Sequence, residues 1–176
     1  MNYYISDTHF GDNRIIELCR RPFKDLDEMT NTISRNWNSI VEKNDSVYIV
    51  GDFAMHYDEE VGELIDSLNG MKTLIPGNHD RELLAEESFR KKMNIGSDIM
   101  TIEDSNRSVT LCHYPMLAFE GSLHNGYHIY GHIHNNYNEP NYNIAKELKN
   151  CFNAGVDVND FTPKTLDELI ARGNAE

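Results

Sequence analysis

Five short polar clusters in this 176-residue chain carry the side chains best suited to bind metal ions. They are Asp7-Thr8-His9, Gly51-Asp52, Gly77-Asn78-His79-Asp80, His113 and Gly131-His132-Ile133-His134. Carboxylate and imidazole groups suit borderline divalent ions such as zinc, manganese or iron, and none of the clusters contains a thiol. Because residues two apart on an extended segment point to the same side, Asp7 and His9 could bind one ion. His132 and His134 are spaced in the same way, with Cα atoms about 6.6 Å apart at roughly 3.3 Å per residue. That separation could serve two ions about 3.5 to 4 Å apart, as in two-metal hydrolytic sites.

Each cluster taken alone also has a plain structural interpretation. An aspartate after a strand is commonly a turn former or a helix cap, and a single histidine such as His113 is commonly a hydrogen-bonded polar group. Five ligand-rich clusters at the ends of predicted strands are harder to explain as unrelated turns, so together they favour a metal site. His56, His124 and His128 lie outside the clusters and are expected to be surface or loop histidines.

The first half of the chain alternates between predicted strands and helices. Short apolar runs at 2–6, 46–50 and 71–75 indicate buried strands, and helical periodicity covers 26–41, 61–68 and 81–93. Asp25 and Glu28 form a capping box at the start of the first of these helices. This alternation predicts parallel strands joined by helical crossovers, and open sheets of that kind place ligands beyond the carboxyl ends of their strands. The first three clusters stand at those ends.

From residue 98 onward the pattern changes to consecutive short strands. They are predicted at 98–102, 108–112, 127–130 and 151–154, with an exposed Asn- and Tyr-rich loop at 135–143. Thr165 and Glu168 form a capping box on a last short helix that ends near Gly173. With no repeat and no linker, residues 1–176 are expected to form a single α/β domain with two sheet regions that could pack face to face.

The order of the clusters resembles the signature of a known family. DxH, GD, GNHD, a single His and GHxH, here running from Asp7 to His134, are the five blocks of the calcineurin-like metallophosphoesterases. The resemblance implies an α/β fold with four αββα layers, a double β-sandwich flanked by helices. It also implies that one metal is bound by Asp7, His9 and His134, that Asp52 bridges both metals, and that the second is completed by Asn78, His113 and His132.

The resemblance implies a hydrolytic mechanism as well. Two divalent ions, with manganese favoured over iron, zinc or nickel, would activate a bridging hydroxide that attacks phosphorus in line. His79 would protonate the leaving oxygen as general acid. Asp80 could orient His79 or could be the N-cap of the helix that starts at Arg81, and the two roles are compatible.

Departures from the family pattern narrow the expected substrate. The chain lacks the GDxxDRG and GNHE forms of the phosphoprotein phosphatases, and the extra domains of larger relatives are not expected in these 176 residues. It resembles the small bacterial and phage type, in which the first block commonly reads on as HFGH, whereas Asp12 holds that fourth position here. We therefore favour a phosphodiester or nucleotide-type ester. The alternatives are a broad phosphomonoesterase and, from another class, a catalytically silent binding module with the same fold.

No substrate-binding residue follows from the motifs. Arg14 and Arg81 lie near metal clusters in the sequence and could contact a phosphate, although solvated helix-face arginines explain them more simply. Tyr114 and the tyrosines of 135–143 could stack on a base, although a role in the loop or at its rim is simpler.

Composition and charge limit the partners. Sixteen Lys and Arg against 29 Asp and Glu give a formal charge of −13, which disfavours long nucleic acid held by a basic surface. Two divalent ions would bring about +4 into the site, so a small phosphoester could still bind there. There is no apolar run long enough for a membrane span and no leader between Met1 and His9, so a cytoplasmic protein is expected. The three cysteines show no metal-binding spacing and are expected to be buried thiols.

Overall fold

The first of two sheets is entirely parallel and carries the amino-terminal half of the chain. The computed structural model describes residues 1–173. Within them, β1 (Asn2–Ile5), β2 (Ser46–Ile49), β3 (Met71–Leu74) and β4 (Asn94–Ile95) pair in that order. The register places Tyr4 beside Tyr48 and Tyr48 beside Thr73. Because all four strands run the same way, their carboxyl ends lie at one edge of the sheet, as the alternating pattern predicts.

The second sheet is mixed. It contains β5 (Ile99–Asp104), β6 (Arg107–Cys112), β7 (Tyr127–Tyr130) and β8 (Cys151–Asn153), in sequence order. β5 and β6 form an antiparallel hairpin, whereas β6, β7 and β8 are parallel. Ser105 and Asn106 at the hairpin tip have φ of 54° and 62°, as a tight type I′ turn requires. The sequence pattern locates these strands to within one or two residues.

Alternation along the strands sorts the first sheet's side chains onto two faces. Ile5 and Ile49 point into a core shared with α2 (Leu26–Ile40) and α3 (Glu59–Ser67). Tyr4 and Val50 point the other way, into a second core that includes residues of the other sheet and of α7 (Leu166–Gly173). The two sheets therefore pack face to face.

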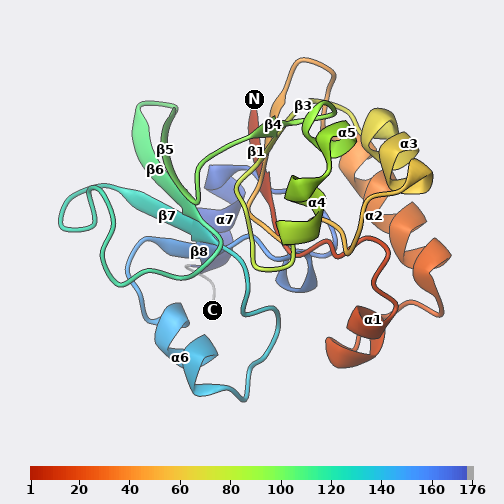
Figure 1. Cartoon of the computed structure of the whole chain (residues 1–176). Coiled ribbons are helices and arrows are strands. Elements are labelled where there is room, and N and C mark those ends of the chain that lie inside the picture. Colours follow the sequence, from red (N-terminus) through yellow and green to blue (C-terminus); the bar gives the residue numbers. More distant parts are fainter. Residues whose placement is uncertain (174–176) are drawn as a thin grey trace.

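On its other side, the second sheet is covered by a smaller cluster. The cluster contains Tyr130 of β7, Ile133 of the segment after β7, and Ala145 of α6 (Pro140–Lys146). The layers thus run helix, sheet, sheet, helix, which confirms the double-sandwich fold class (Figure 1).

Side-chain caps begin several helices where the sequence places them. The Asp25 carboxylate accepts a hydrogen bond from the Glu28 backbone N–H at 2.9 Å, and Asp58 caps α3 in the same way. Thr165 and Glu168 form a reciprocal capping box, with bonds of 2.8 and 3.3 Å, before α7. Each of these bonds satisfies an N–H group that the helix leaves without a partner.

Two predicted elements differ from the structure. The helix expected at 81–93 is two short helices, α4 (Arg81–Ala85) and α5 (Glu87–Arg90), separated by Glu86 in an extended conformation with ψ of 117°. Leu83 and Phe89 are both buried, yet six residues along one continuous helix would put them about 120° apart. The break lets both reach the core. The loop expected at 135–143 contains the start of α6, with Pro140 at its first position, where the missing N–H costs nothing.

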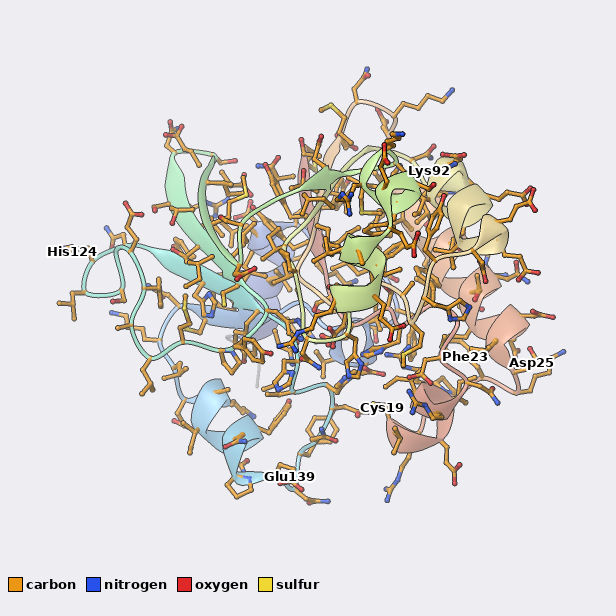
Figure 2. All side chains as sticks on the ribbon, in the orientation of Figure 1. Cys19, Phe23, Asp25, Lys92, His124 and Glu139 are labelled. Carbon is orange, nitrogen blue, oxygen red and sulfur yellow. The ribbon has the colours of Figure 1, made fainter. Side chains whose placement is uncertain are left out.

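The remaining histidines and the cysteines also have defined places. His124 is exposed on the loop between β6 and β7 and points away from the molecule (Figure 2), and His56 is exposed as well. The expectation for His128 is wrong: it is buried in β7, with Nδ1 3.0 Å from the Thr110 carbonyl oxygen and Nε2 3.2 Å from the Met116 N–H. Such bonds let a histidine belong to a core.

The free cysteines Cys19 and Cys112 are buried and Cys151 is partly so. The short helix α1 (Arg14–Leu18) follows the first polar cluster. No helix in residues 1–173 is long and apolar enough to cross a membrane.

The stability of this core can be tested at α2. Ile33 is fully buried there, so Ile33→Ala should lower the free energy of unfolding by about 2–5 kcal/mol, because it leaves a cavity. The same substitution at Ile144 of α6, whose side chain is 57% exposed, should change it by less than about 0.5 kcal/mol. Urea unfolding of both variants measures the difference, and equal effects would contradict the assigned core.

Candidate metal centre

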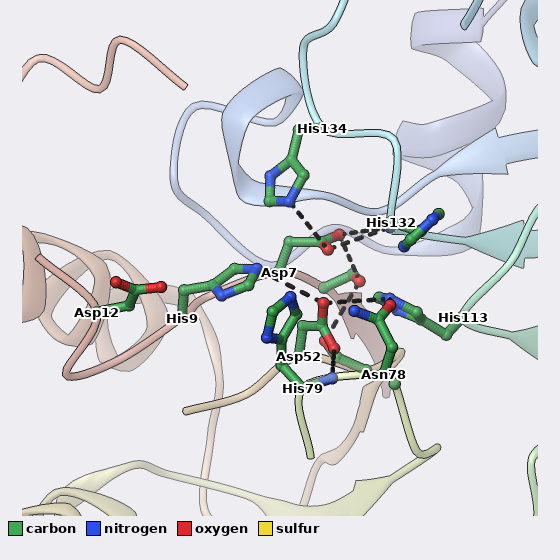
Figure 3. A network of polar contacts seen from close by, with 12 residues as sticks. Asp7, His9, Asp12, Asp52, Asn78, His79, His113, His132 and His134 are labelled. Atoms are coloured by element: carbon green, nitrogen blue, oxygen red, sulfur yellow. Dashed lines mark hydrogen bonds and ion pairs between the residues drawn. The ribbon is translucent and has the colours of Figure 1, made fainter. Parts of the chain in front are cut away.

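The polar clusters of both sheets meet at one place. Asp7, Asp52 and Asn78 follow β1, β2 and β3, so the parallel strands bring them to the same edge. His113 and His132 follow β6 and β7 of the second sheet, which delivers them to the same point (Figure 3). The polar clusters, from the first at Asp7 to the last at His134, thus converge as the sequence predicts.

The converging side chains form two groups of possible ligands. The ligand atoms of Asp7, His9 and His134 lie within 4.8 Å of one another, and so do those of a second group formed by Asp52, His113 and His132. Asn78 extends the second group, since its Oδ1 lies 3.2 Å from His113 Nε2. Apart from Asp52, which the resemblance assigns to both metals, the members of each group belong to one of the two implied ligand sets.

Asp52 belongs to the second group and also faces the first. Its Oδ2 is 3.6 Å from His9 Nε2 in the first group and 3.3 Å from His113 Nε2 in the second. The other oxygen, Oδ1, accepts a hydrogen bond from the His79 backbone N–H at 2.9 Å. This bond fixes the carboxylate, so that Oδ2 faces both imidazoles.

Most of the candidate ligands have a strained backbone. Five of the seven lie in the left-handed region, with φ between 47° and 70°: Asp7, His9, Asp52, His132 and His134. This conformation costs an ordinary residue about 1–2 kcal/mol and persists only where surrounding contacts enforce it. Here the Asp7 N–H donates to the Gly51 carbonyl and the His9 N–H to the Asp52 carbonyl, both at 3.0 Å. The two strand ends therefore hold each other in place.

Two cluster glycines are required by close approach. A Cβ atom on Gly131 would lie 1.9 Å from Ser6 Oγ and 2.4 Å from Asp7 Oδ2. One on Gly77 would lie 2.3 Å from Asp52 Oδ1. Only glycine lets these loops pass so near the carboxylates, which explains why the third and fifth clusters begin with it.

The Asp7 carboxylate is oriented by the loop that carries the last cluster. Its two oxygens accept the His132 backbone N–H at 3.0 and 3.1 Å, and Ser6 Oγ donates to Oδ2 at 2.7 Å. His134 Nε2 lies 3.6 Å from Asp7 Oδ1. The β7 loop is therefore tied to β1 through this one side chain.

Burial and charge strongly shift the pKa values of these groups. Burial would raise the pKa of Asp52, but the hydrogen bond with His113 lowers it to about 2. Burial would lower the pKa of His113, but the bond with Asp52 and the charge of Asp7 raise it to about 9. Burial lowers the pKa of His9 to about 4, although Asp7 and Asp52 oppose this. The carboxylates thus create a negative potential that favours cations.

The donor set fits divalent metal ions. His9 is buried, and neither ring nitrogen has a hydrogen-bond partner among the described residues. A buried polar group without a partner is costly, and a neutral imidazole has a lone pair that can coordinate a metal. Together with the carboxylate and amide oxygens around it, His9 matches the nitrogen and oxygen ligands of zinc, manganese, iron or nickel.

A buried ion pair lies behind the centre, and no sequence motif predicts it. Asp157 Oδ2 lies 2.7 Å from His134 Nδ1. Arg21 donates bidentate hydrogen bonds to the same carboxylate, from Nε to Oδ1 at 2.8 Å and from Nη2 to Oδ2 at 3.1 Å. Arg21 also donates to the carbonyls of Asp7 at 2.7 Å and Thr8 at 2.9 Å. Asp157 belongs to η1 (Val156–Val158), 136 residues from Arg21, and no local motif links the two.

Asp157 sets the orientation of His134. Burial alone would lower the pKa of His134, but the bonds with Asp157 and Cys19 raise it to about 11. With Nδ1 engaged by Asp157, Nε2 faces Asp7. A carboxylate that fixes the far nitrogen of a ligand histidine in this way both orients the ring and increases its basicity.

The two predicted catalytic residues have different surroundings. His79 is exposed, and its ring lies edge-on to the His9 ring with centroids 5.2 Å apart. The Asp80 carboxylate accepts hydrogen bonds from the N–H groups of Gly77 at 2.7 Å, Asp52 at 2.8 Å and Phe53 at 2.9 Å.

Asp80 is not the side-chain cap of α4, because it makes no capping hydrogen bond and its own backbone is helical. Burial raises its pKa. The three hydrogen bonds that its carboxylate accepts from backbone N–H groups tie the loop after β3 to the loop after β2. Any effect of Asp80 on the His79 ring would therefore pass through the backbone.

Arg14, Arg81 and Tyr114 are the side chains that the sequence suggests for phosphate or base contacts. Arg14 is paired with Asp12, at 3.0 Å from Nε to Oδ1 and 3.2 Å from Nη2 to Oδ2, and Arg81 is exposed at the start of α4. Asp12 is buried beside the first cluster and holds this arginine at the surface. The Tyr114 ring lies edge-on to His132 at 4.7 Å.

Sequence comparison matches the chain to a known family and to two relatives. The model of the calcineurin-like phosphoesterase family matches residues 3–148. The chain is 34% identical over 170 residues to the uncharacterized protein MJ1445 of Methanocaldococcus jannaschii, a match that covers 96% of this chain and 88% of that protein. It is 36% identical over 81 residues to the Gene 66 protein of Mycobacterium phage L5, covering 44% of this chain and 39% of that one.

Solved structures share the fold. The protein of unknown function AQ665 from Aquifex aeolicus superposes with a TM-score of 0.76 and 27% identity, over 98% of each chain. The Pseudomonas putida nuclease MPE superposes with a TM-score of 0.51 and 17% identity, over 76% of this chain and 60% of that one.

The role of the buried ion pair can be tested by removing one charge. Asp157→Asn should weaken Mn²⁺ binding about 10- to 100-fold, because the amide no longer holds His134 as a carboxylate does. Arg21 would keep its bonds to the Asp7 and Thr8 carbonyls. Isothermal titration with Mn²⁺ measures the affinity, with Asp160→Asn, an exposed surface position, as the matched control. Unchanged affinity in a folded Asp157→Asn protein would contradict this role.

Proposed function

Because the chain belongs to the calcineurin-like phosphoesterase family, we propose that it hydrolyses phosphoesters with two divalent metal ions and prefers a phosphodiester or nucleotide-type ester. One observation carries the proposal: Asp52 Oδ2 faces a histidine of each ligand group, 3.6 Å from His9 Nε2 and 3.3 Å from His113 Nε2. A shared carboxylate of this kind is what a two-metal hydrolytic site needs.

Seven side chains would hold the ions. One ion would be held by Asp7, His9 and His134, the other by Asn78, His113 and His132, with Asp52 between them. When bound, such ions lower the pKa of water toward neutrality and offset the charge that develops on phosphoryl oxygens. Nitrogen and oxygen ligands accept several metals, and manganese is the ion we favour over iron, zinc or nickel.

The chain's own groups would handle the leaving group. His79 is exposed beside the His9 ring, a position that supports contact with an ester oxygen at the centre. Its imidazole would donate a proton to the leaving oxygen as the bond to phosphorus breaks. Its backbone N–H holds Asp52 Oδ1, and Asp80 fixes the same loop, so the acid and the shared carboxylate are positioned together.

Two rival functions are separable from this one. A broad phosphomonoesterase would cleave p-nitrophenyl phosphate as well as its diester, and the arginine that clamps a monoester in the family's phosphatases is missing from the second cluster. A silent binding module would cleave neither, yet the chain retains every ligand together with His79.

The proposed activity is tested with chromogenic esters. With Mn²⁺, the protein should hydrolyse bis-(p-nitrophenyl) phosphate faster than p-nitrophenyl phosphate. Asp52→Asn should lower kcat/KM on the order of 10³-fold, because the shared carboxylate is lost, and asparagine tolerates the φ of 56° at this position. Asp27→Asn on the exposed face of α2 should leave the rate unchanged. No turnover with Mn²⁺, Fe²⁺, Zn²⁺ or Ni²⁺ would point instead to the binding module.

The general acid is tested by the leaving group. His79→Ala should keep the bound metal, and should lower kcat for an alkyl ester, whose leaving group needs a proton, by about 10²- to 10⁴-fold. The p-nitrophenyl ester should be affected far less, since p-nitrophenolate leaves without protonation. His56→Ala, at an exposed position outside the clusters, is the control. Equal losses for both esters, or none for the alkyl ester, would show that His79 is not the acid.

A further inference from the structure

An apolar cavity opens directly beside the metal centre. Its volume is about 340 Å³, and it lies between the segment after β6 and helix α6. The residues that shape it include Tyr114, Leu117, His132, Ile133, Asn141 and Ile144. His132 belongs both to this wall and to the second ligand group, so an occupant of the cavity would lie beside the candidate metal ligands.

Tyr114 joins the cavity to the centre. Its ring lies edge-on to His132 at 4.7 Å and to His113 at 5.2 Å, and its hydroxyl is 3.5 Å from Asn78 Oδ1. The ring is 46% exposed, so one part contacts the ligand groups and the rest is free to contact a substrate. An exposed aromatic ring of this kind is a stacking surface for a flat group.

The lining is unusual for so acidic a protein. None of the described residues that line the cavity is Lys, Arg, Asp or Glu. The Leu117 residue is 79% exposed and Ile144 is 57% exposed. Exposed apolar side chains grouped around a cavity commonly mark a binding site. Asn141 adds one amide, which can both donate and accept hydrogen bonds. This lining suits a neutral, flat group with one polar edge, and a nucleobase has these properties.

The size of the cavity limits the occupant to one unit. Small-molecule sites range over about 300–1,000 Å³, and this cavity lies near the lower end. A single nucleoside fits that range better than a chain of nucleotides. The absence of cationic lining among the described residues agrees, since a longer strand would bring further phosphates that need neutralising.

We propose that this cavity binds the nucleoside of a phosphodiester, namely the nucleoside that stays attached to phosphorus after cleavage. The inference rests on the proposed function. Figure 3 shows the His79 ring on the His9 side of Asp52 and the His132 ring on the other side. If His79 protonates the leaving oxygen, the group beside His132 is the one that does not leave.

The overall reaction is a simple hydrolysis. Water forms a new bond to phosphorus, the bond from phosphorus to the leaving oxygen breaks, and one proton passes to that oxygen. The nucleoside remains on the product as a phosphomonoester. Only a diester has a second organic group, so the cavity accounts for diester preference through binding of the retained group.

Two esters with the same leaving group test the proposal. The p-nitrophenyl ester of thymidine 5′-monophosphate and methyl p-nitrophenyl phosphate differ only in the group that stays on phosphorus. With Mn²⁺, kcat/KM should be about tenfold or more higher for the thymidine ester, mainly through KM, since apolar pockets discriminate to this extent. Leu117→Ala/Ile144→Ala should reduce that ratio toward one. Leu123→Ala, at 93% exposure outside the cavity, should leave the ratio and both rates unchanged.

The outcomes separate the two proposals. Hydrolysis of both esters at equal kcat/KM would overturn the nucleoside site and leave the phosphoesterase intact. A high ratio that persists in the double variant would place the nucleoside elsewhere and overturn the cavity assignment. If neither ester is cleaved with Mn²⁺, Fe²⁺, Zn²⁺ or Ni²⁺, the proposed function fails, and the subsite fails with it.

Discussion

The position of one carboxylate, Asp52, governs the arrangement of the whole centre. Its backbone N–H donates to Asp80 at 2.8 Å, its Oδ1 accepts from the His79 N–H at 2.9 Å, and its Oδ2 faces an imidazole of each ligand group. The residue has a φ of 56°, and Gly77 leaves room for its oxygen. These contacts come from the segments that follow β1, β3 and β6, so the carboxylate has its place only when both sheets are assembled.

The rest of the fold can be understood as support for that position. The first sheet delivers both aspartates, and the second contributes His113, His132 and His134 by packing face to face with it. Behind this surface, the Arg21–Asp157 pair stabilises the Asp7 loop and orients His134. A buried ion pair is costly unless fully bonded, and Arg21 satisfies this condition through two further carbonyls. An acidic chain thus builds a pocket whose own charges favour cations, and the proposed anionic ester would bind there only once metal ions are present.

Much of this arrangement is readable from the sequence because strand ends and ligand types coincide there. The strands that precede Asp7, Asp52, Asn78, His113 and His132 are short apolar runs, and parallel pairing brings the ends of the first three together regardless of the details of packing. The same reasoning misses Asp157 and Arg21, because their contact joins segments 136 residues apart and leaves no periodic trace. It also misplaces His128, since only the tertiary structure provides the Thr110 carbonyl that satisfies its ring. Helices α4, α5 and α6 differ from prediction for a similar reason: packing of Leu83 and Phe89, and of Ala145, decides where these segments break or begin.

The central claim is that Asp52 is shared by two metal ions. The most direct measurement is an anomalous difference map from crystals of the protein grown with Mn²⁺. We expect two peaks, one in contact with Asp7, His9 and His134, the other with Asn78, His113 and His132, and the Asp52 carboxylate between them at a separation of about 3.5–4 Å. A single peak, or two peaks that do not share Asp52, would contradict the account.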